Sequence, residues 1–231
     1  MRSVRDSRGA DDDRTARARI RDAAIGCFAD HGYRGTSVRA IAEAAGVSAG
    51  LVIHHFGSKD ALRVACDEHV AGTIRTRKAA AMSAGPPFDP VAALRTGAGD
   101  PPLMRYLART LVEGSPHTAE LVDELVAGAA DYTAEGVRTG VLRPTTLPYE
   151  RAAVLTLWSL GVLVLHEHLQ RLLGVDLTAA EQDPSAMAPY ITPVLEVFSE
   201  GLLTQEAAAQ MRAAFAAAAG GRDDEHKEAA S

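Results

Sequence analysis

Histidine and lysine side chains stand out in a stretch that is otherwise small and apolar. The sequence GVSAGLVIHHFGSKDAL, residues 46–62, places His54 beside His55, and Lys59 follows. Adjacent residues of a helix point about 100° apart, and no cysteine or carboxylate lies nearby at the spacing of metal ligands. We therefore predict no metal here. The remaining alternatives are a buried segment and a surface that contacts a charged partner.

A second histidine group, HEHLQ at residues 166–170, superficially resembles a zinc-hydrolase motif. That motif needs histidines at i and i+4 on one helix face, and the i+4 residue here is Gln170. The sequence also lacks a G-x-S-x-G nucleophile pattern and a phosphate-binding loop with its lysine. We expect no cofactor and no enzyme. A helical enzyme, or a ligand-binding protein without a regulatory role, is the alternative hypothesis.

Apolar spacing around residues 46–62 predicts short helices that would position these side chains. Residues 38–45 and 49–56 both carry helix-like apolar patterns, and the intervening Gly46-Val47-Ser48 predicts a tight turn. Gly46 suits a positive φ, and Ser48 can cap the second helix. This is helix-turn-helix geometry over about residues 37–56, a motif whose second helix enters the DNA major groove.

The charge distribution fits a polyanionic partner for the N-terminal part of the chain. Residues 1–78 hold 14 Lys and Arg against 10 Asp and Glu, a balance of +4, although the whole chain carries −6. Residues 79–231 therefore carry −10. Such an asymmetry favours DNA contact by the first part, with solvation of a surface as the alternative.

The whole chain is predicted to be all-α, because no strand-like alternation persists. We expect disorder over residues 1–13 and 219–231. Two cysteines, no secretory signal and no membrane-spanning apolar run predict a cytoplasmic protein without a membrane partner. Beyond a long helix from Ser58 to Met82 and a proline-rich break, helices are expected at 89–97, 101–113, 116–139, 148–173, 187–205 and 205–218.

The first quarter of the chain resembles the DNA-binding domain of TetR-family transcriptional regulators. The resemblance rests on AAIGCFADHGYRGT followed by TSVRAIAEAAGVSAGLVIHHFGSKDAL. It implies a helix-turn-helix domain over residues 14–74 and a divergent helical domain over 75–218. One position departs from the pattern: most members have a phosphate-contacting tyrosine where this chain has Ile53, so Ile53 or Leu51 could instead pack on a thymine methyl. The implied DNA-contacting residues are Thr36, Ser37, Arg39, Ser48, Ala49, Gly50, Leu51, Ile53, His54, His55 and Lys59.

The resemblance also implies how such a protein acts. We expect a homodimer paired through the helices near 148–173 and 187–205, a repressor on a pseudo-palindromic double-stranded operator, and release by a small, mainly apolar effector. The helices near 101–113, 116–139 and 148–173 would frame the effector pocket, although the alternative is that Trp158, Tyr106, Tyr132 and Met104 belong to the core, as such residues more often do. The candidate pocket residues are Met104, Tyr106, Leu107, Leu111, Tyr132, Leu155, Trp158 and His166.

Overall fold

The computed structural model describes residues 3–85, 101–115, 117–179 and 184–215, and these residues form helices and connecting turns without strands. They fall into two compact units, residues 1–186 and 187–231, which we describe separately. The all-α prediction is confirmed for the described residues. The predicted helix at 89–97 and the tail at 219–231 lie outside them.

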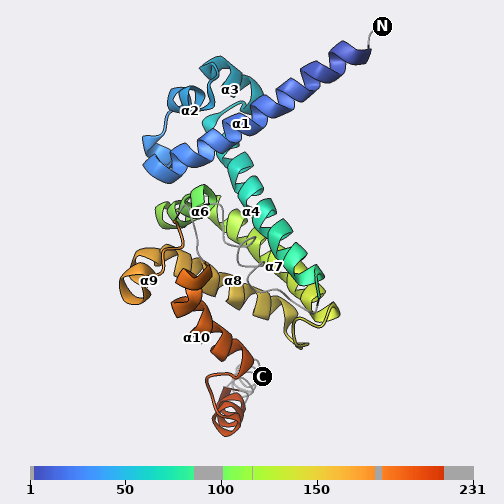
Figure 1. The fold of residues 1–231 in the computed structure, drawn as a ribbon, viewed down its shortest axis with the longest axis vertical. Coiled ribbons are helices and arrows are strands. Elements are labelled where there is room, and N and C mark those ends of the chain that lie inside the picture. Colours follow the sequence, from blue (N-terminus) through green and yellow to red (C-terminus); the bar gives the residue numbers. More distant parts are fainter. Residues whose placement is uncertain (1–2, 86–100, 116, 180–183, 216–231) are drawn as a thin grey trace, which may run out of the picture. The chain divides into compact units, whose positions relative to one another are not determined.

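The first unit begins with four helices that build the helix-turn-helix (Figure 1). Its first helix starts at Ser3, within the arm expected to be disordered, and is kinked at Gly32 (φ 73°, ψ 169°). The stripe of Ile20, Ala24 and Phe28 is buried against the following helices. The four helices are α1 (Ser3–Gly35), α2 (Val38–Ala45), α3 (Ala49–Phe56) and α4 (Lys59–Ser83).

Local sequence explains the turn between α2 and α3. Ser37 Oγ accepts a hydrogen bond from the Ala40 N–H and caps α2, and Ser48 Oγ accepts one from the Leu51 N–H and caps α3, as predicted for Ser48. Gly46 adopts the left-handed conformation that ends α2. From α1, Arg19 Nη2 donates to the Ala45 carbonyl at 2.7 Å, which fixes the end of α2 against α1.

The helix α4 links these helices to the remainder of the first unit. It contacts α1 and α3, and it also packs along α7 (Thr118–Arg138), while α6 (Pro101–Glu113) packs on α1 and α8. Glycines on α7 permit the close approach of α4. A Cβ on Gly128 would lie 3.3 Å from Arg75 Cδ, and one on Gly136 would lie 2.8 Å from Met82 Sδ.

The long helix predicted over residues 148–173 is broken in the structure. It forms α8 (Pro148–Val164) and α9 (His166–Leu173), whose axes differ by 74° at the break. No single described helix is long and apolar enough to cross a membrane. The bent pair α8 and α9 meets this criterion of length and composition only when the two helices are counted together. Ala152 and Leu163 of α8 are buried, whereas Val154, Leu157 and Trp158 are exposed. One face of α8 therefore carries exposed apolar side chains in the described part of the chain.

The second unit is short and helical. A 3-10 turn, Pro184–Met187, leads into α10 (Ala188–Ser199), and a further helix covers residues 205–215. The predicted helix at 187–205 ends early, at Ser199. Gly201 then adopts a positive φ of 84°, which is incompatible with a continuing α-helix. Leu195 and Phe198 of α10 are exposed.

Candidate nucleic-acid interface

The helix α3 presents small and polar side chains to solvent while it buries its opposite face. Val52 and Phe56 are buried at i and i+4. At the start of the helix, Ser48, Ala49 and Gly50 are exposed. These small residues leave the helix N-terminus open to close approach by another surface. Further along the same face, Ile53 is 44% exposed and His54 is exposed.

Arg39 and Ser37 flank this face from α2, and both are exposed. Arg39 projects from the first turn of α2, directly after the cap formed by Ser37. Its guanidinium makes no hydrogen bond or ion pair with the described part of the chain, so its donors are available to a partner. A guanidinium fork of this kind can bind a guanine edge bidentately or contact a phosphate.

Thr36 does not belong to this surface, contrary to the expectation from the sequence. Its residue is 3% exposed, and its hydroxyl donates to the Gly32 carbonyl at 2.7 Å, with the Cys27 carbonyl 3.0 Å away. The hydroxyl is therefore engaged by backbone carbonyls of α1 at the kink and just before it. Thr36 therefore has no free polar group at the surface of the interface.

Two more candidates lie only partly at the surface. Leu51 is partly buried and packs against the core cluster. His55 is also partly buried, with its ring edge-on to Phe56 at 6.4 Å between centroids. His54 is therefore the better placed of the two histidines for an external contact.

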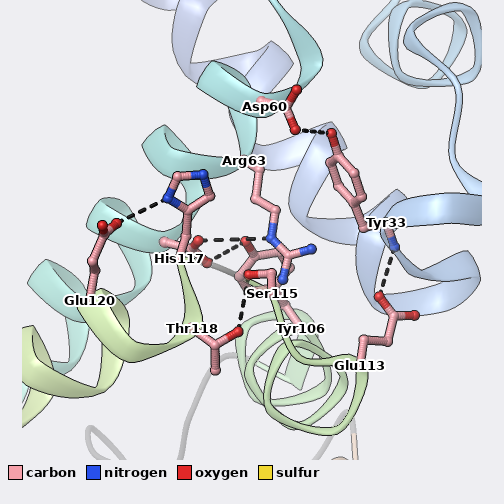
Figure 2. A network of polar contacts seen from close by, with 10 residues as sticks. Tyr33, Asp60, Arg63, Tyr106, Glu113, Ser115, His117, Thr118 and Glu120 are labelled. Atoms are coloured by element: carbon pink, nitrogen blue, oxygen red, sulfur yellow. Dashed lines mark hydrogen bonds and ion pairs between the residues drawn. The ribbon is translucent and has the colours of Figure 1, made fainter.

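Lys59 is held by the protein itself. Its ammonium donates to the Tyr33 carbonyl and lies 4.1 Å from the centroid of the Tyr33 ring. Burial lowers the pKa of Lys59, Asp60 raises it, and Arg63 lowers it further, with a net lowering. The Tyr33 hydroxyl in turn donates to Asp60 (Figure 2). A phosphate contact by Lys59 would therefore have to share the ammonium with Tyr33.

A polar network that the sequence did not reveal joins these helices to α6 (Figure 2). In it, the Tyr106 hydroxyl donates to Asp67 Oδ1 at 2.6 Å in a buried position. Arg63 Nε lies 3.9 Å from Asp67 Oδ2, and both side chains are at least nine-tenths buried. Burial raises the pKa of Asp67, and the Tyr106 hydrogen bond and Arg63 only partly oppose the rise. In the sequence, the i, i+4 spacing of Arg63 and Asp67 on one helix could have indicated this ion pair.

The network corrects part of the predicted effector pocket. Tyr106 and Leu107 are at most 2% exposed and belong to the core cluster that α6 shares with α1 and α4. Of the remaining candidates, Trp158 is 41% exposed and the others are partly buried. Two open hollows of about 460 and 340 Å³ lie elsewhere, on α4 and between α1, α3 and α4. The partly buried or exposed candidates are Met104, Leu111, Tyr132, Leu155, Trp158 and His166.

The chain matches two family descriptions. Residues 20–66 match "Bacterial regulatory proteins, tetR family", and residues 100–204 match "Tetracyclin repressor-like, C-terminal domain". The transcriptional regulatory protein RaaS of Mycobacterium tuberculosis is 44% identical over 195 residues, which cover 84% of this chain and 90% of that protein. The transcriptional repressor AcnR of Corynebacterium efficiens is 48% identical over 50 residues, 22% of this chain and 27% of that protein.

Solved structures share the fold. A TetR-family regulator from a Rhodococcus species has a TM-score of 0.54 at 20% identity, covering 80% of this chain and 98% of that one. Another from Mesorhizobium loti has a TM-score of 0.53 at 18% identity, covering 80% and 96%. At these identities the likeness concerns the fold alone.

Proposed function

Because this chain belongs to the TetR family of transcriptional regulators, we propose that α3 enters the major groove of a pseudo-palindromic operator and that the protein represses transcription there. The exposed face of α3, bordered by Arg39, is the observation that carries this proposal. We call residues 15–70, which hold this face and the helices that support it, the reading head.

The side chains of the reading head take distinct roles in this proposal. Ala49 and Gly50 bring the N-terminus of α3 close to the base edges, and Ile53 packs on a thymine methyl. Arg39 contacts a base edge or a phosphate. Ser37, Ser48 and His54 supply polar contacts that set the register of the protein on DNA.

A second copy of the chain is needed to read both half-sites. TetR-family proteins are typically homodimers, and the exposed apolar side chains of α8, with Val154 62% and Leu157 57% exposed, suit such a contact. Leu195 and Phe198 of α10, 55% and 54% exposed, offer a further apolar surface. We propose that α8 and α10 form the dimer contact, which sets the distance between two reading heads.

Effector-controlled release is typical of the family and completes the proposal. A small, mainly apolar molecule would bind among α6, α7 and α8, with Tyr132, Leu155 and Trp158 as contacts. It would favour a state in which the two reading heads no longer match the operator spacing, since a ligand shifts an equilibrium only by binding one state more tightly. The chain would act in the cytoplasm, where bacterial operators are found.

Fluorescence anisotropy tests DNA binding directly. The purified protein is titrated onto the DNA upstream of its own gene and onto a scrambled fragment, at several salt concentrations. Selective binding with a steep salt dependence is expected, because each neutralised phosphate releases counterions. If neither fragment is bound selectively, selection from random sequences follows. Failure to select any site would refute the proposal.

A matched pair of arginine variants identifies the surface used. Arg39→Ala is expected to lower operator affinity by about 1–3 kcal/mol if the guanidinium reads a base. Arg171→Ala removes an arginine that is also exposed, on α9 outside the reading head, and should leave affinity unchanged. Equal losses in the two variants would show that net charge, rather than the face of α3, drives binding.

A further inference from the structure

Two hydrogen bonds join α6 to the reading head at separate points, beside a longer and exposed ion pair of 3.8 Å between Arg105 and Asp30. One lies on α4, where Tyr106 bonds Asp67, and the other lies at the kink of α1, where Glu113 bonds Tyr33 (Figure 2). Asp67 and Tyr33 belong to the reading head, whereas α6 lies outside residues 15–70. The two contacts are seven residues apart on α6 and engage different helices, so together they resist rotation as well as translation.

The first contact is buried and charge-assisted. The Tyr106 hydroxyl lies 2.6 Å from Asp67 Oδ1, and the residues are 1% and 6% exposed. A hydrogen bond to a buried carboxylate is stronger than one between neutral groups, and it cannot be replaced by water without opening the core. The Tyr106 ring also lies 6.3 Å from the Phe28 ring of α1.

The second contact fixes the backbone of α1 where the helix is kinked. Glu113 Oε2 accepts a hydrogen bond of 3.1 Å from the Tyr33 N–H. Arg109 Nε donates to the other carboxylate oxygen of Glu113 at 2.8 Å and so orients the carboxylate. Although burial raises the pKa of Glu113, the hydrogen bonds from Arg109 and the Tyr33 N–H bring it below its ordinary value.

We propose that Tyr106 and Glu113 are positioning residues that fix the orientation of the reading head on α6, and thereby the spacing of two heads in the dimer. The inference deepens the proposed function and rests on it. It gives Tyr106 a role different from the effector contact expected from the sequence. Neither residue touches DNA in this proposal.

The two contacts should matter for a complete operator and not for half of one. Binding a full palindrome engages both heads of one dimer, and the gain from the second head depends on how well its position matches the second half-site. Binding an isolated half-site requires only one intact head. Loosening the attachment to α6 therefore lowers full-site affinity selectively, which a loss of head stability alone would not do.

The test compares Tyr106→Phe and Glu113→Gln with the wild type on two DNAs, the selected full operator and a fragment that contains one half-site. Glu135→Gln is the matched control, because Glu135 of α7 pairs with an arginine of its own helix, Arg138, outside the reading head, and its side chain is about as exposed as that of Glu113, 26% against 28%. Circular dichroism and thermal unfolding establish that each variant is folded. Glu113→Gln, at a partly exposed site, keeps the test valid if Tyr106→Phe does not fold.

We expect each of the two variants to lose about tenfold in full-site affinity, within the usual range of coupling between sites. Half-site affinity should stay within about twofold, and Glu135→Gln should match the wild type. An unchanged ratio of full-site to half-site affinity would overturn the inference. So would equal losses on both DNAs, because they would place the defect inside the reading head. A wild-type protein that binds neither DNA would instead refute the proposed function.

Discussion

The carboxylate of Glu113 occupies the space that a side chain at Gly32 would need. A Cβ built on Gly32 would lie 2.0 Å from Glu113 Oε1, and Gly32 itself has a φ of 73° and a ψ of 169°. Only glycine adopts this conformation readily and leaves room for the carboxylate to reach the Tyr33 N–H. The contact between α6 and α1 therefore depends on the absence of a side chain as much as on the charge of Glu113.

Gly32→Ala should destabilise the protein more than a substitution at another glycine with positive φ. Gly57 (φ 77°) is a suitable control, because a Cβ there would meet nothing within 4 Å. Both alanines force an unfavourable backbone at a cost of about 1–3 kcal/mol. Gly32→Ala also displaces the Glu113 carboxylate from the Tyr33 N–H, and the loss of that hydrogen bond should cost about 1 kcal/mol in addition. Urea unfolding measures both, and equal losses would contradict the close contact.

The buried carboxylate of Asp67 predicts a pH dependence of stability. Its pKa is raised above the ordinary 3.8 in the folded protein, mainly by burial. The folded state therefore binds the proton more tightly than the unfolded state, so the contribution of Asp67 to stability is present below the unfolded pKa and is lost as the pH rises through the folded pKa. Asp67→Asn should lack this loss. Urea unfolding of both proteins across this pH range measures it, and parallel curves would show that Asp67 does not titrate abnormally.

Two serine caps should separate folding from DNA recognition. Ser48 caps α3 and Ser58 caps α4, with Oγ accepting from the Leu51 and Ala61 N–H groups. Replacing either serine by alanine should cost about 1 kcal/mol of unfolding free energy. Ser48→Ala should also weaken operator binding when the variant is fully folded, whereas Ser58→Ala should not. Fluorescence anisotropy below the melting temperature compares the operator affinities of the two variants. Equal affinities would exclude Ser48 from the interface.

An acidic residue among the exposed apolar side chains of α8 should separate the two copies. Leu157 is 57% exposed on α8, and Leu157→Glu would bury an uncompensated charge in the proposed dimer contact. We expect a monomer by analytical ultracentrifugation and loss of the full-site advantage in DNA binding. Val112→Glu is the control, since Val112 is 67% exposed on α6. A dimeric Leu157→Glu protein would place the contact elsewhere.

Local chemistry made the helix-turn-helix predictable. The caps at Ser37 and Ser48 and the left-handed Gly46 are each decided by residues within a few positions, and all three are found in the structure. The burial of Val52 and Phe56 also followed from their spacing. By contrast, the predicted helix over residues 148–173 bends after Val164, where nothing in the sequence resembles a helix terminator.

The sequence by itself determined the helical class, the placement of α2 and α3, and the family, because capping, turn geometry and apolar spacing act over short distances along the chain. Only the tertiary structure decided which polar side chains remain available. It buried Thr36 beneath the kink of α1, turned Lys59 onto Tyr33, and moved Tyr106 from a predicted pocket to Asp67. These contacts join residues 4, 26 and 39 positions apart, and the more distant ones form only when α1, α4 and α6 pack together.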